Sequence, residues 1–108
     1  MSSSDSNGAT PAFRELSDSE MIEALEIGHT FPGDFPIVVI AKHGDDFPKL
    51  LEQTVSQAQG DAAYSITERP SSEGRYVSYR VEVHVDSAHE ALERKRLISG
   101  LDGVILLL

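Results

Sequence analysis

Residues 76–85 are the segment that most constrains the fold, because polar and apolar side chains alternate along their whole length. Such alternation predicts a β-strand with one face in a core and the other toward water. The inward set is Val77, Tyr79, Val81, Val83 and Val85, and the outward set is Tyr76, Ser78, Arg80, Glu82 and His84. The chain should therefore contain a sheet that helices cover on one face only.

The neighbouring segments complete a regular order of strands and helices. Residues 35–42 are a dense β-branched run typical of a central strand, residues 62–69 alternate, and residues 103–108 are a last, wholly apolar strand. Helical spacing of apolar residues appears after residue 45 and after Ser87, where a capping box begins. The order β-α-β-β-α-β predicts an α+β fold of the ferredoxin-like (ACT-like) type, a two-layer sandwich with a four-stranded antiparallel sheet and two helices on one face. The first and third strands should be central, and the second and fourth should be edges.

The chain divides into three parts. Residues 1–16 are small and polar with almost nothing to bury, so we expect a disordered acidic tail. Residues 17–34 should form a short helix, opened by a capping box of Ser17 and Glu20, and then an irregular linker. Residues 35–108 form the βαββαβ domain. The short N-terminal helix would be marginal alone and needs a surface on which to dock.

Composition limits the function. The 108 residues make one domain, and the absence of cysteine excludes disulfides, thiolate metal sites and cysteine nucleophiles. The net charge is −9, of which residues 1–34 supply −6, so we expect neither a nucleic-acid nor a membrane partner. No apolar run approaches the roughly 18–20 residues that span a bilayer, and no secretory signal is present, which predicts a cytoplasmic protein.

The sheet face without helices, called here the open face, should carry an apolar patch. Alternation places Val38 and Ile40 of the first strand, and Ile105 and Leu107 of the last, on this face. A soluble monomer rarely leaves such a patch bare. Either the N-terminal helix or a second copy of the protein could cover it. We favour the helix, because it belongs to the same chain and has no other evident place to dock.

Residues 69–76 connect the second and third strands and admit two interpretations. In the first they form a hairpin turn, in which Pro70 fixes a turn, the serines satisfy backbone groups and Gly74 supplies a positive φ. In the second they form an anion pocket from backbone N–H groups, two hydroxyls and two guanidinium groups, with a third guanidinium from the next strand. The pocket would use Arg69, Ser71, Ser72, Arg75 and Arg80. Turn chemistry accounts for most of these residues, and Glu73 in the middle of the loop opposes an anion.

The same loop carries a resemblance to a known family. The strongest match is the motif Pro70-Ser71-Ser72-x-Gly74-x-Tyr76-x-Ser78, and the upstream matches are Phe31-Pro32, Phe35, Pro48, Leu51 and Val55. Through these residues the chain resembles the YbeD-like family of small bacterial proteins of unknown function. The resemblance covers residues 31–108. It implies an ACT-like fold, and because some members carry the name lipoate regulatory protein, it implies a regulatory rather than a catalytic role.

No catalytic constellation stands out among the polar residues. His84 and His89 lie near Asp86 and Glu90, but their spacing matches no common metal-ligand pattern. The basic run at residues 94–96 should be a solvated helix face. We therefore expect no enzyme and no cofactor, but a regulatory or protein-interaction module whose partner is a second copy or an unidentified protein. The alternative is a sensor of small anionic metabolites that uses the loop and strand at residues 69–80.

Overall fold

The computed structural model describes residues 16–108, so all but the last residue of the predicted tail lies outside the described residues. The elements in chain order are α1 (Asp18–Gly28), β2 (Gly33–Lys42), α2 (Asp46–Gln59), β3 (Tyr64–Pro70), β4 (Tyr76–Val85), α3 (Ala88–Ser99) and β5 (Val104–Leu107). The predicted order of helices and strands is confirmed.

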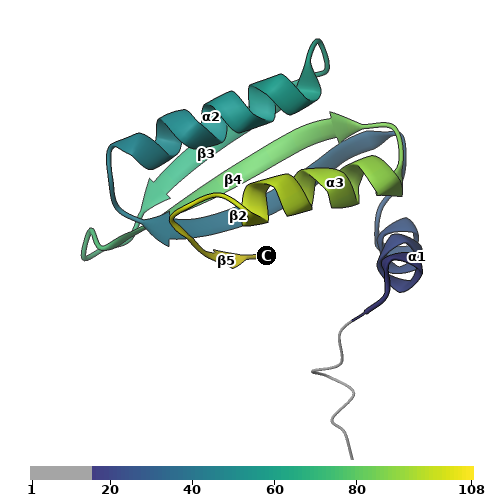
Figure 1. Cartoon of the computed structure of the whole chain (residues 1–108), viewed down its shortest axis with the longest axis horizontal. Coiled ribbons are helices and arrows are strands. Elements are labelled where there is room, and N and C mark those ends of the chain that lie inside the picture. Colours follow the sequence, from purple (N-terminus) through teal and green to yellow (C-terminus); the bar gives the residue numbers. More distant parts are fainter. Residues whose placement is uncertain (1–15) are drawn as a thin grey trace, which may run out of the picture.

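The four strands form one antiparallel sheet in the order β3-β4-β2-β5. As predicted, β2 and β4 are central, and β3 and β5 are the edges. Helices α2 and α3 lie across the same face of the sheet, which leaves the other face open (Figure 1). This arrangement is the ferredoxin-like sandwich.

The core lies between the sheet and the two covering helices. Alternate residues of β2 and β4 face it, and Ile37, Val39 and Val81 have no exposed surface. Leu51 of α2 and Ala91 of α3 are equally buried from the other side. Phe47 packs against Tyr79 with their ring centroids 5.3 Å apart. The strict alternation of burial in β4 is the pattern that the sequence predicts.

The last strand differs from prediction in which of its residues face the core. Ala41 pairs with Val104 and Ile40 with Leu106, so Ile105 is an extra residue that forms a bulge. A shift of one residue reverses the faces of all later side chains. Leu107 therefore pairs with Val39 and packs against the core, which makes its predicted place on the open face wrong.

Helix α1 does not cover the open face, contrary to our expectation. It lies beside α3 on the helical side of the molecule (Figure 1), and its Leu25 packs against the core. The linker that follows turns the same way, because the ring of His29 packs edge-on against core-facing Phe35 at 4.8 Å between centroids. The apolar part of the open face is thus left without a cover by the residues described.

A buried glutamine ties the two covering helices to the sheet. Gln59, at the end of α2, donates from Nε2 to the carbonyls of Ala63 and His84, both at 2.9 Å. Its Oε1 accepts from Nε of Arg94 in α3 at 2.7 Å. The Arg94 side chain is only 12% exposed, so the prediction that residues 94–96 are merely a solvated face is wrong for this arginine.

Candidate functional site

The loop after β3 is a hydrogen-bonded hairpin turn. The N–H of Ser71 donates to the carbonyl of Tyr76 at 2.8 Å, and the N–H of Gly74 donates to the carbonyl of Ser71 at 3.0 Å. The Ser71 hydroxyl accepts from the Tyr76 N–H at 3.2 Å, and Gly74 has a φ of 76°. These contacts give Ser71 and Gly74 the turn-forming roles of the first interpretation.

The five residues predicted for an anion pocket are not gathered in one place. Arg75 lies in the loop beside the Glu73 carboxylate at 3.5 Å, and Arg80 is paired with Glu82 at 3.1 Å. The exposed hydroxyls of Ser71 and Ser72 stay at the turn. Arg80 lies five residues from Arg75, about 16 Å along an extended strand.

Two of the arginines do share a surface. Arg69 pairs with Ser78, and Thr67 pairs with Arg80, so both arginine side chains lie on the open face at diagonal positions. Such diagonal neighbours are roughly 7–8 Å apart, within reach of long side chains. The structure therefore brings Arg69 and Arg80 together, and leaves Ser71, Ser72 and Arg75 at the turn.

Two of the histidines, His29 and His84, make contacts that join segments of the fold. His84 and Asp34 are cross-strand partners, and Nδ1 of His84 is 3.2 Å from the Asp34 carboxylate. Within that range no group of three or more histidine, aspartate or glutamate side chains is placed to hold a metal ion. No helix of the same range is long and apolar enough to cross a membrane.

The open face has a polar half and an apolar half. The polar half follows β3 and the outward residues of β4. The apolar half lies where β2 meets β5, since Ile40 pairs with Leu106 and Val38 exchanges two backbone hydrogen bonds with Leu108. We call Val38, Ile40, Leu106 and Leu108, with Ile105 at the bulge, the β5 patch. Its three β5-side members are 49% (Ile105), 48% (Leu106) and 61% (Leu108) exposed.

Sequence reasoning found only part of this patch. It placed Val38, Ile40 and Ile105 on an exposed surface, and it missed Leu106 and Leu108. A wholly apolar strand has no alternation from which its phase could be read, and a bulge leaves no signature there.

The strand order and the two covering helices define a small ferredoxin-like domain. A family model described as "Protein of unknown function (DUF493)" matches residues 27–108, and the chain belongs to this family. The YbeD-like resemblance in the loop motif is thereby confirmed.

Two individual proteins are similar to this chain. A UPF0250 protein of Paraburkholderia phymatum is 36% identical over 69 residues, which covers 57% of this chain and 78% of that protein. The solution structure of protein HP0495 from H. pylori superimposes with a TM-score of 0.63 at 20% identity, covering 94% of this chain and 97% of the other. At that identity the second similarity concerns the fold alone.

Proposed function

We propose that this chain is a non-enzymatic regulatory or protein-interaction module that pairs with a second copy of itself through the β5 patch. The observation that carries the proposal is the difference between the two edges of the sheet. The β3 edge ends in Glu68, Arg69 and Pro70, and charge and proline are two of the devices that keep an edge strand from pairing.

The β5 edge is short and has one bulge, but it carries neither charge nor proline. Its residues are Val104 to Leu107, all aliphatic, and its outer row of backbone N–H and carbonyl groups faces away from β2. An uncharged apolar edge is a template for another strand. A second β5 is a suitable partner, because a two-fold axis lets identical strands pair with each other and bury the same leucines from both copies. A continuous sheet through both copies would link a ligand site on one copy to the same site on the other. Such a link between sites is the basis of a regulatory role.

Sedimentation of the full chain, over concentrations that span the dimer dissociation constant, tests this proposal. We expect Leu106→Lys to raise that constant about thirtyfold, because half-burying a leucine is worth about 1 kcal/mol and the dimer contains two. Ile27→Lys is the matched control, since Ile27 is 83% exposed on α1, and it should leave the dimer intact. A wild-type chain that remains monomeric throughout, or a control that dissociates equally, would refute dimerisation through β5.

A second candidate is a sensor of small anions on the polar half of the open face. The neighbouring positions of Arg69 and Arg80 support it, since two guanidinium groups at that spacing can share a phosphate or carboxylate. Titration with inorganic phosphate should then shift the amides around Arg69 and Arg80, and Arg69→Gln should abolish the shifts. Arg75→Gln is the control, because Arg75 lies away at the turn. Equal effects of both substitutions would indicate only nonspecific binding.

A further inference from the structure

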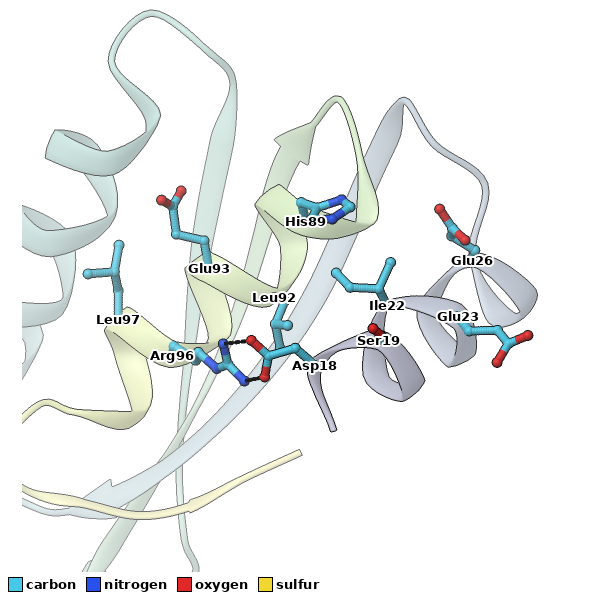
Figure 2. A pocket seen from close by; sticks show the side chains of 10 residues that line it. All are labelled: Asp18, Ser19, Ile22, Glu23, Glu26, His89, Leu92, Glu93, Arg96 and Leu97. Atoms are coloured by element: carbon cyan, nitrogen blue, oxygen red, sulfur yellow. Dashed lines mark hydrogen bonds and ion pairs between the residues drawn. The ribbon is translucent and has the colours of Figure 1, made fainter. Parts of the chain in front are cut away.

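A groove of about 910 Å³ separates α1 from α3 on the helical side of the molecule (Figure 2). Its apolar lining consists of Ile22 from α1 and Leu92 and Leu97 from α3. Ile22 points across the groove toward α3 (Figure 2). Because no residue of α1 is fully buried, this helix leaves its apolar side partly available to another molecule.

An ion pair holds the groove at one end. The two carboxylate oxygens of Asp18 accept from the guanidinium of Arg96 at 2.6 and 3.2 Å (Figure 2). This hydrogen bonding lowers the pKa of Asp18, and the charge of Arg96 adds to the effect. Ser17 starts α1 beside this pair with a complete capping box to Glu20. The pair neutralises its own two charges, so it contributes no net charge to the groove.

The remaining charged residues of the groove are acidic. Glu93 of α3 is paired with its neighbour Arg94. Glu23 and Glu26 of α1 also line the groove, and neither forms an ion pair with another residue in the range 16–108. The surface is therefore an apolar lining with two carboxylates on the α1 side that no residue of the range 16–108 pairs.

We propose that this groove binds a basic amphipathic helix of a partner protein. The aliphatic face of such a helix would contact Ile22, Leu92 and Leu97, and its lysines or arginines would meet Glu23 and Glu26. The stretch from His89 to Leu97 is about 12 Å long, which matches two turns of a helix laid alongside.

Charge complementarity selects this occupant over the protein's own segments. The whole chain has a net charge of −9, and residues 1–34 account for most of it. A second copy that inserted its α1 region would bring like charges together. The groove is lined by α1 and α3 and the β5 patch by β2 and β5, so the two proposals rest on different residues.

The probe for this site is a leucine–lysine peptide about 14 residues long, roughly four helical turns, with leucine at helical spacing. A control peptide of the same composition has strict leucine–lysine alternation, which favours an extended strand. At low salt, titration of the full chain with the helical peptide should shift the amides of α1 and α3. The control peptide should bind more weakly and without this localisation.

Charge reversal identifies the carboxylates that matter. Glu23→Lys with Glu26→Lys should weaken binding of the helical peptide about tenfold, roughly the loss of two exposed ion pairs. The matched control is Asp61→Lys with Glu68→Lys, which makes the same change of net charge at exposed sites on and beside β3. It should change the affinity less than about threefold. Leu97→Ser, at a 45% exposed position, tests the apolar lining and should also weaken binding.

Three results would overturn the proposal. Equal losses from both charge-reversed pairs would mean that the peptide senses only net charge. Amide shifts centred on the open face would place the peptide elsewhere. Contacts in the free full chain between residues 1–15 and the methyl groups of Ile22 or Leu92, seen as nuclear Overhauser effects, would show that the chain fills its own groove.

Discussion

Replacing Gln59 with leucine removes three hydrogen bonds from a side chain that is only 6% exposed. Two are neutral bonds to the carbonyls of Ala63 and His84, each worth about 1 kcal/mol, and the third comes from the charged Arg94, worth about 1.5 kcal/mol or more. The apolar leucine side chain is similar in size but forms no hydrogen bonds. The two carbonyls and the Arg94 guanidinium would therefore stay near the protein interior without a hydrogen-bond partner. We expect the free energy of unfolding to fall by about 3 kcal/mol, a large part of the roughly 5–15 kcal/mol typical of a domain.

Urea denaturation of the full chain measures this loss. With a slope of about 1.5 kcal/mol per molar urea, the midpoint should fall by roughly 2 M. Gln57→Leu is the matched control, since Gln57 is exposed on the same helix, and its midpoint should stay close to that of the wild type. Equal midpoints for the two variants would refute the view that Gln59 ties α2 and α3 to the sheet.

Two further predictions concern backbone strain and pH. Gly103→Ala should lower the melting temperature more than Gly74→Ala. Both glycines have a positive φ, so both substitutions strain the backbone. An added Cβ at Gly103 would in addition lie 3.2 Å from the Phe47 side chain, whereas one at Gly74 would meet nothing within 4 Å. Similar melting temperatures would contradict this steric argument. Because Arg96 lowers the pKa of Asp18, the ion pair stabilises docked α1 fully above the ordinary pKa of 3.8, and this contribution is lost as pH falls through the lowered value. Nuclear Overhauser effects between α1 and α3 should weaken over that acidic range, and Asp18→Asn should weaken them at neutral pH as well. If neither change weakens them, the Asp18–Arg96 pair does not hold α1 against α3.

The sandwich itself could be predicted from sequence because its signals are local and periodic. The alternation at residues 76–85 fixed one strand and its inward face, and the buried residues of β4 are the predicted ones. The capping box at Ser17 forms as expected, because both of its partners lie within one turn of helix. The turn at Gly74 likewise depends on residues next to it in the chain.

The candidate surfaces depend on contacts between distant residues, which periodicity does not encode. The bulge at Ile105 depends on how β5 meets β2, so the exposure of Leu106 and Leu108 could not be read from an apolar run. The place of α1 depends on a pair of residues, Asp18 and Arg96, that are 78 positions apart. From the sequence, the charge of Asp18 or of Arg96 indicates only that the residue is exposed, and it does not indicate that the two side chains meet.

Pairing of two copies through β5 can be observed in a sample that mixes isotopically labelled and unlabelled full chains. Filtered nuclear Overhauser spectra of this sample report only contacts between different copies. Pairing through β5 predicts contacts between copies from the methyl groups of Ile105, Leu106 and Leu108. A dimer whose contacts between copies come only from other surfaces, such as α1 or β3, would contradict it.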